Sequence, residues 1–276
     1  MATPLTLCLI PSRTGSQRIT GKNFRPLVGL SPLERAIGCC QLLRILHDTQ
    51  IIVTSDGEPT FTGAVLWHQV GAPLHTDECS MVDVVTDVLM HYPSDPEQRV
   101  LLVQPTQPLR TVEHLEHALR LLETHPSVVS MVETTSADKA YYISPWHTLE
   151  PLGRGVERDQ DSERTYACDG TVYGFHRGWF LRHRQFRHHD QTYPLLIPQA
   201  DTCRLDTPHD WLVASLLLAH RGTKANHERT PLPSLDPELI EPLGRDCSVG
   251  TGTVAHGRCE AASGNDRGGS LYPPHQ

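Results

Sequence analysis

Short apolar runs alternate with amphipathic stretches along the first two thirds of the chain. Leu5–Ile10 is almost wholly apolar and stops at Pro11, which is typical of a strand buried on both faces of a parallel sheet. Leu33–Leu46 repeats its apolar residues every three or four positions, which predicts an amphipathic helix. The chain therefore opens as a strand, a polar loop and a helix.

The same alternation continues downstream. Further strands are expected at Ile51–Val53, Val100–Val103, Ser127–Val132, Thr171–Phe175 and Leu195–Ile197. Further helices are expected at Phe61–Val70, from Ser80 with Asp83 in a capping box, at Leu115–Leu122, and from Thr207-Pro208 to Leu218. Strands and helices in turn predict an α/β fold with a doubly wound, mostly parallel sheet.

Two stretches break the pattern. Residues 137–165 are polar and rich in proline, glycine and charge, which indicates an insertion, a dimerisation arm or a lid. Residues 224–276 lose periodicity and gain Gly, Ser, Pro and His, so a largely disordered tail is expected there. The predicted organisation is one domain over residues 1–223 and a polar tail.

Charge and cysteine usage narrow the function. The net charge of −8 argues against a nucleic-acid partner, which would need a basic face. The sequence contains no run of about 20 apolar residues that would predict a membrane span. Its eight cysteines are scattered and form no C-x-x-C pair, which favours a reducing cytoplasm. His183, His188 and His189 lie in an Arg-rich stretch that we interpret as a solvated loop, with metal binding as the less favoured alternative.

The strongest chemical signal is the polar loop Pro11–Asn23, directly after the first strand. Ligands of open α/β sheets bind beyond the carboxyl ends of the strands. Glycine and serine can offer backbone N–H groups to phosphates, and Arg13, Arg18 and Lys22 add positive charge, as the departure of pyrophosphate from a triphosphate requires. The loop lacks G-x-x-x-x-G-K-[ST] and G-x-G-x-x-G, so an ordinary basic loop remains the alternative.

This segment resembles the N-terminal signature of the acylneuraminate cytidylyltransferases and, more distantly, that of the 3-deoxy-manno-octulosonate cytidylyltransferases. The pattern apolar-P-A-R-x-G-S-K-R-x-x-x-K-N appears here as Ile10–Arg18 followed by Lys22-Asn23. Further segments resemble the family in the same order: I-V-T-S-D at 52–56, T-D-x-x-S-x-x-D-V-V at 76–85, L-L-V-Q-P-T-Q-P-L-R at 101–110, S-V-V-S at 127–130, D-G-T-V-Y at 169–173 and L-D-T-P-H-D at 205–210.

The resemblance implies a nucleotide-diphospho-sugar-transferase-like fold and a site for CTP. The residues implied in nucleotide binding are Arg13, Gly15, Ser16, Arg18, Lys22, Asn23, Asp77 and Ser80. Those expected to be catalytic are Arg13, Lys22, Gln104 and Asp206, and those expected to contact the acceptor are Gln104, Lys139 and Arg204. Asp206 can hold Mg²⁺ against the phosphates, although a carboxylate this close to a helix start could instead be its N-cap.

Four features depart from the family. Gln17 replaces a lysine, Asp169 replaces an asparagine, and the R-P-x-x-L stretch after Gly71 is missing. Arg204 replaces the first carboxylate of the D-x-D-T pattern, and a guanidinium binds anions bidentately. We therefore expect a phosphonate acceptor such as phosphonoformate, in natural-product biosynthesis, while a surface ion pair is the alternative role of Arg204.

The sequence thus predicts a cytoplasmic, homodimeric cytidylyltransferase that joins CMP from CTP to a small acidic acceptor. A sialic-type acid or 3-deoxy-manno-octulosonate is the alternative acceptor. A sugar-1-phosphate nucleotidyltransferase or a related glycosyltransferase shares the sheet and the basic loop, and a nucleotide-binding protein without turnover is the remaining alternative.

Overall fold

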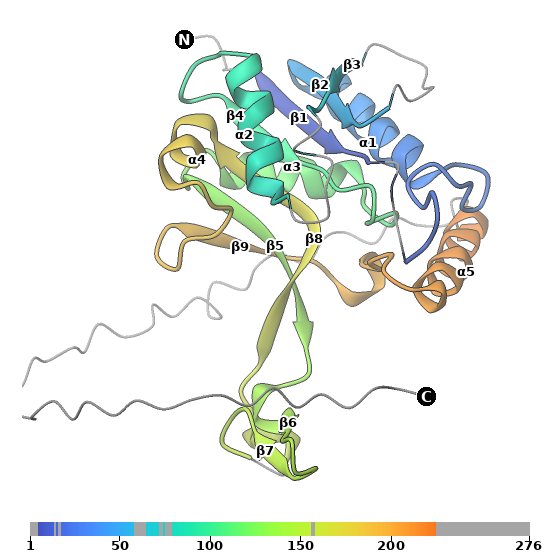
Figure 1. Ribbon diagram of the computed structural model, residues 1–276, viewed down its shortest axis with the longest axis vertical. Helices are drawn as coiled ribbons and strands as arrows, with labels where there is room; N and C mark the ends of the chain where they lie inside the picture. The colour runs from blue at the N-terminus through green and yellow to red at the C-terminus, as the bar shows by residue number, and fades with distance from the viewer. Residues whose placement is uncertain are drawn as a thin grey trace, which may run out of the picture. The chain divides into compact units, whose positions relative to one another are not determined.

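The computed structural model describes residues 5–13, 15, 18–57, 65–71, 74, 79–155 and 158–224. Seven strands form one sheet in the order β3-β2-β1-β4-β8-β5-β9 (Figure 1). Their bounds are β1 Thr6–Pro11, β2 Thr49–Ser55, β3 Leu66–Gln69, β4 Arg99–Leu102, β5 Ser127–Thr134, β8 Thr165–His176 and β9 Thr192–Leu196. Within this sheet β8 alone is antiparallel to its neighbours, so the prediction of a mostly parallel sheet is confirmed.

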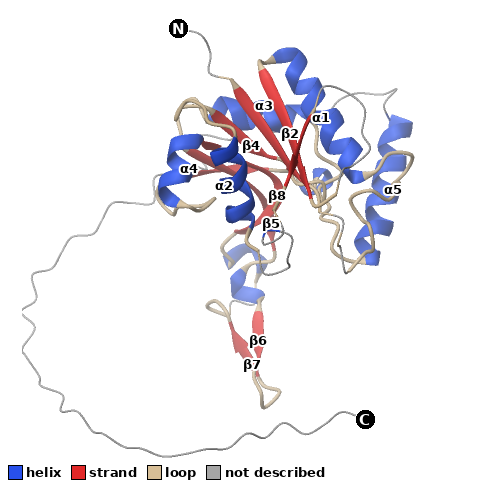
Figure 2. Cartoon of the chain, turned by 45° about the horizontal axis from the view of Figure 1, so that its top comes forward, coloured by secondary structure: helices blue, strands red, loops and turns tan. Residues whose placement is uncertain are grey.

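Helices cover both faces of the sheet, as Figure 2 shows. Their bounds are α1 Pro32–Leu46, α2 Met81–His91, α3 Val112–Leu121 and α4 Arg177–His183. Alternate residues of β1 point to opposite faces: Cys8 and Ile10 pack with α1 and α3, whereas Leu7 and Leu9 pack with α2 and α4. This two-sided burial explains why the first strand is apolar throughout and confirms the doubly wound arrangement.

The predicted helix Phe61–Val70 is wrong where it can be compared, because Leu66–Gln69 is a strand, β3. It pairs in parallel with β2, in a register that places Trp67 opposite Val53. The buried His68 of β3 also approaches Asp87 of α2, with Nε2 and Oδ2 2.8 Å apart. Pairing with the edge of the sheet outweighs a weak local helical pattern here.

α5, Pro208–Lys224, follows β9 and begins with proline at its first position, as expected. Apart from Lys224, which ends this helix, the predicted tail at 224–276 lies outside the described residues. No helix in the described ranges is long and apolar enough to cross a bilayer.

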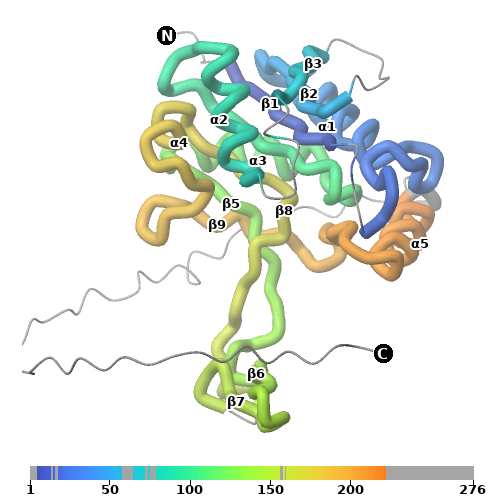
Figure 3. Tube along the Cα trace, viewed as in Figure 1, coloured from blue at the N-terminus to red at the C-terminus, as the bar shows by residue number. Residues whose placement is uncertain are grey.

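Beyond Met131, the last residue of β5 that pairs with β9, β5 and β8 continue as a two-stranded ladder, visible in Figure 3. At its far end lies the segment we call the arm, residues 135–164, with the short antiparallel strands β6, Tyr141–Ile143, and β7, Leu149–Pro151. The buried Asp138 carboxylate accepts hydrogen bonds from the backbone N–H and the guanidinium of Arg154 at 2.8 and 2.9 Å. The Arg154 hydrogen bonds hold the pKa of Asp138 well below its usual range, so Asp138 joins the two ends of the arm as a carboxylate.

Candidate active site

The loop after β1 turns back sharply, and glycine makes the turn possible. Gly21 has a φ of +60°, in the left-handed region that glycine enters without steric strain. Its carbonyl accepts hydrogen bonds from the backbone N–H groups of Phe24 and Arg25, both at 2.9 Å. This tight turn brings Lys22 back to the carboxyl-end edge of the sheet.

A cavity of about 620 Å³ opens at the carboxyl ends of β1, β2 and β4, within the usual range for small-molecule sites. Six of the predicted site residues line it: Arg13, Arg18, Lys22, Asn23, Gln104 and Asp206. Further lining residues, for which no site role was predicted, are Ser12, Thr54, Ser55, Asp56, Pro105 and Thr106. Each of these follows or ends a parallel strand, so the carboxyl-end rule applied strand by strand would have included them.

Lys22 is the most enclosed cation of the cavity, with a side chain only 15% exposed. Its Nζ donates a hydrogen bond to the Leu205 carbonyl at 2.8 Å and lies 3.9 Å from Oδ1 of Asp206. Burial lowers the pKa of the Lys22 ammonium, and the Asp206 carboxylate opposes that shift. Such a desolvated ammonium interacts strongly with an incoming anion because little water screens it.

Asp206 lies among three cations. Arg18 approaches Oδ1 at 3.5 Å, on the same oxygen as Lys22, and Nε of Arg204 lies 2.5 Å from Oδ2. Two other residues, Thr207 and Asp210, cap α5. The Thr207 hydroxyl accepts a hydrogen bond from the Asp210 N–H at 3.2 Å, and the Asp210 carboxylate accepts one from the Thr207 N–H at 2.7 Å. The Asp206 carboxylate therefore pairs with the cationic side chains and is not the N-cap of α5.

These pairings bear on the predicted magnesium site. Both oxygens of Asp206 already face positive charge, so a dication bound to either would lie within a few ångströms of other cations and be repelled. The nearest carboxylate along the chain, that of Asp210, is occupied in capping α5. As arranged, Asp206 and Asp210 do not fit a Mg²⁺ held between them.

Gln104 follows the carboxyl end of β4, and its backbone and side chain each have a close neighbour. The Arg110 guanidinium donates to the carbonyl groups of Gln104 and Thr171, both at 2.5 Å. Gly170 of β8 has a φ of +85°, and a Cβ at this position would come within 2.9 Å of Oε1 of Gln104. Glycine is therefore favoured by the backbone conformation, and a larger residue at this position would also displace the Gln104 side chain.

The departure at Asp169 has a local explanation. Its buried carboxylate accepts hydrogen bonds from the backbone N–H and the hydroxyl of Thr171, one on each oxygen. Both bonds need an oxygen as acceptor, which a carboxylate supplies twice and an asparagine amide only once. The carbonyl of Asp169 accepts from the Gln107 amide. Asp169 thus shapes the strand beside Gln104 and is not among the residues that line the cavity.

The remaining predicted residues lie elsewhere or outside the described ranges. Ser80 caps α2, accepting from the Asp83 N–H at 3.2 Å, while its neighbours Cys79 and Met81 line the cavity. Gly15 is exposed, and Lys139 belongs to the arm; neither lines the cavity. Ser16 and Asp77 lie outside the described residues. Their assignment to the nucleotide site stays a prediction.

Comparison with known proteins adds to this geometry. The chain is 26% identical over 225 residues to the CMP-N,N'-diacetyllegionaminic acid synthase of Legionella pneumophila, covering 77% of this chain and 95% of that protein. It is also 26% identical over 221 residues to an N-acylneuraminate cytidylyltransferase of Streptococcus agalactiae, covering 75% of this chain and 51% of the relative. The chain therefore spans about half the length of that streptococcal protein.

Among solved structures, the fold resembles that of a CMP:2-keto-3-deoxy-manno-octonic acid synthetase complexed with CTP. The TM-score is 0.56 at 16% identity, with 79% of this chain and 100% of the other covered. The family model described as cytidylyltransferase matches residues 7–145, which include β1, its cationic loop and Gln104. The chain accordingly belongs to the cytidylyltransferase family and is a CTP-dependent nucleotidyltransferase.

Proposed function

We propose that this enzyme transfers CMP from CTP to a small sugar acid of the sialic or octulosonic type, releasing pyrophosphate. The observation that carries the proposal is the convergence of Arg13, Arg18 and Lys22 on one cavity that also contains Gln104. The relatives named above, which act on sugar acids by name, support this acceptor class.

In the proposed reaction an acceptor oxygen attacks the α-phosphorus of CTP in line. The new P–O bond forms as the bond to the β-phosphate oxygen breaks. Pyrophosphate leaves with the electron pair, and the proton of the acceptor hydroxyl is released to solvent. Arg13, Arg18 and Lys22 stabilise the charge that develops on the leaving group, and the Gln104 amide orients the acceptor. Mg²⁺ stays a prediction; given the pairings of Asp206, it would enter with the triphosphate and not through a pair of protein carboxylates.

The expectation of a phosphonate acceptor has little support. It rests on Arg204 as a cation free to bind a second anion, whereas the Arg204 guanidinium is paired with Asp206. Its charge is therefore largely compensated, and the surface ion pair is the better account of a side chain that is 55% exposed. The sugar-acid acceptor, first considered as the alternative, becomes the main proposal.

The acceptor class is tested by pyrophosphate release with CTP and a panel of compounds. We expect release with a sialic acid or with 3-deoxy-manno-octulosonate, and none with N-acetylmannosamine, a neutral sugar without a carboxylate. Release with phosphonoformate alone would replace this proposal by the phosphonate acceptor. Release with sugar 1-phosphates, or CTP binding without any turnover, would favour the other two hypotheses.

Replacing Lys22 tests the role of the buried ammonium. Lys22→Ala should lower kcat about 10²–10³-fold, the usual cost of losing one group that stabilises developing charge. Arg25→Ala is the matched control, because Arg25 lies in the same connection between β1 and α1, packs over the Trp211 ring at 5.3 Å and does not line the cavity. Equal turnover of the two variants, with unchanged circular dichroism, would remove Lys22 from the mechanism.

Arg204→Asp tests the account of the metal. It removes one cation from Asp206 and places a second carboxylate two positions away, so binding of Mn²⁺, followed by electron paramagnetic resonance without nucleotide, should tighten by about tenfold or more. The dependence of turnover on Mg²⁺ should become steeper. Arg204→Ala, which adds no carboxylate, should show a smaller change. The same Mn²⁺ titration in wild type and both variants would contradict this account of Asp206.

We also propose that the arm forms a homodimer with a second copy. Its short hairpin exposes large apolar side chains, among them Ile143 at 72% and Trp146 at 81%. A two-stranded hairpin alone is marginally stable in water and gains from burying such a surface. Within one chain Lys139 does not line the cavity, so its predicted contact with an acceptor would have to be made by the arm of a partner.

The dimer is tested by light scattering after gel filtration. Ile143→Asp combined with Trp146→Asp should convert a dimer into a monomer without loss of secondary structure, because a charge at an apolar interface is costly. Leu216→Asp is the control, since Leu216 is 63% exposed on α5, outside the arm. A wild-type monomer, or a dimer that survives the double substitution, would contradict the proposal.

A further inference from the structure

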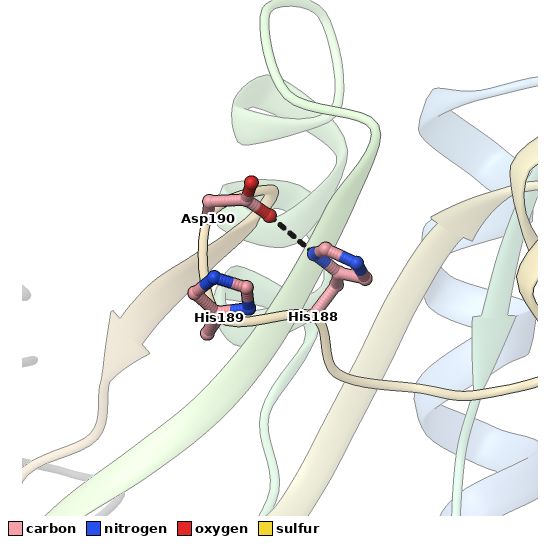
Figure 4. Close-up of side chains that lie close together, drawn as sticks. All are labelled: His188, His189 and Asp190. Carbon is pink, nitrogen blue, oxygen red and sulfur yellow. Dashed lines mark hydrogen bonds and ion pairs between the residues drawn. The ribbon is translucent and has the colours of Figure 1, made fainter. Parts of the chain in front are cut away.

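A histidine-rich loop lies at the amino end of β9, whereas the cavity lies at the carboxyl ends of strands parallel to it. The loop follows α4 and contains His188, His189 and Asp190, shown in Figure 4. One ligand atom from each of the three side chains lies within 4.8 Å of the other two. None of the three lines the nucleotide cavity, so the reaction proposed above does not use them.

The loop is already fixed in the conformation that brings these groups together. The His188 carbonyl accepts from the backbone N–H groups of Gln191 and Thr192 at 3.2 and 3.0 Å. The His188 backbone N–H donates to the Thr192 hydroxyl at 2.7 Å. An ion that bound here would therefore order few additional backbone torsions.

Asp190 contributes an interaction that recurs around metal-binding histidines. Its Oδ1 is hydrogen bonded to Nδ1 of His188, as Figure 4 shows. With Nδ1–H donating to the carboxylate, the lone pair of the His188 imidazole resides on Nε2, the tautomer that ligates through Nε2. Because Nδ1 and Nε2 point to opposite sides of the ring, Asp190 holds His188 from behind and leaves Nε2 free for an ion.

The neighbouring groups supply further ligands and access. The imidazoles of His188 and His189 stack with centroids 5.1 Å apart, and that of His183, at the end of α4, lies 5.4 Å from His188. His189 and Asp190 are exposed, and a cavity of about 530 Å³ is lined by both His188 and His189. The adjacent cation, Arg187, is directed to the Cys168 sulfur at 3.3 Å.

We propose that His188 and His189 bind a divalent transition-metal ion of the Zn²⁺ class, with His183 close enough to be a third ligand and Asp190 orienting His188. Imidazole nitrogens are ligands that Zn²⁺ accepts in tetrahedral sites at about 2.0–2.1 Å, with water in the remaining position. The bound ion would cross-link side chains of the loop between α4 and β9 and so stabilise this edge of the sheet. It would take no part in the transfer reaction.

The test is Zn²⁺ binding by isothermal titration calorimetry with the full chain. Wild type should bind one equivalent more than His188→Ala combined with His189→Ala. Asp190→Asn, which keeps the shape of the loop, should bind about 10–100-fold more weakly. His91→Ala is the matched control, because His91 is exposed and lies on α2, away from this loop.

Thermal melting supplies a second measurement. Saturating Zn²⁺ should raise the Tm of wild type and of His91→Ala by a few degrees more than that of the double variant. Pyrophosphate release by the double variant should equal that of wild type, which separates this site from the catalytic cavity. Equal Zn²⁺ stoichiometry, affinity and Tm shift in all four proteins would overturn the proposal.

Discussion

The ammonium of Lys22 connects two parts of the chain that are 183 positions apart, because it donates to the Leu205 carbonyl. A cation this enclosed is costly unless it is paired, and Asp206 supplies the opposite charge for Lys22, Arg18 and Arg204 together. The cationic loop after β1 and the segment before α5 are thus held at one edge of the sheet. A triphosphate carries its own negative charge, so Lys22 and Arg18 can turn from Asp206 to the phosphates while Arg204 stays paired with that carboxylate.

The periodicity of the chain was sufficient for most of the fold, because strands buried on both faces and amphipathic helices have distinct patterns. β1, β2 and α1 begin and end within two residues of their predicted positions. The antiparallel direction of β8 could not be predicted, since strand direction is set by the path of the arm between β5 and β8. The mistake at Leu66–Gln69 has a similar cause: four residues with little pattern of their own become a strand by pairing with β2.

The site was less fully predictable. Arg13, Arg18 and Lys22 could be assigned together because they share one loop after a strand, and Gln104 and Asp206 could be assigned by resemblance. The pairing of Arg204 with Asp206 could not be assigned, because residues two positions apart in an irregular segment face each other only for particular backbone torsions. Nor could the sequence decide whether Asp206 or Thr207 caps α5, because both residue types are common at that position.

The chain has only three lysines, Lys22, Lys139 and Lys224, and arginine carries the rest of its positive charge. Several arginines donate to backbone carbonyls of loops, as Arg35 does to Leu27 and Val28, and Arg221 to Leu109. The planar guanidinium, with five donors, can bridge two carbonyl groups at once, which a compact ammonium does less well. Arg110 bridges Gln104 and Thr171 in this way without lining the cavity. A cation behind the site thus holds the backbone carbonyl of Gln104. Lys22, a compact and desolvated charge, is the lysine placed where phosphate is expected.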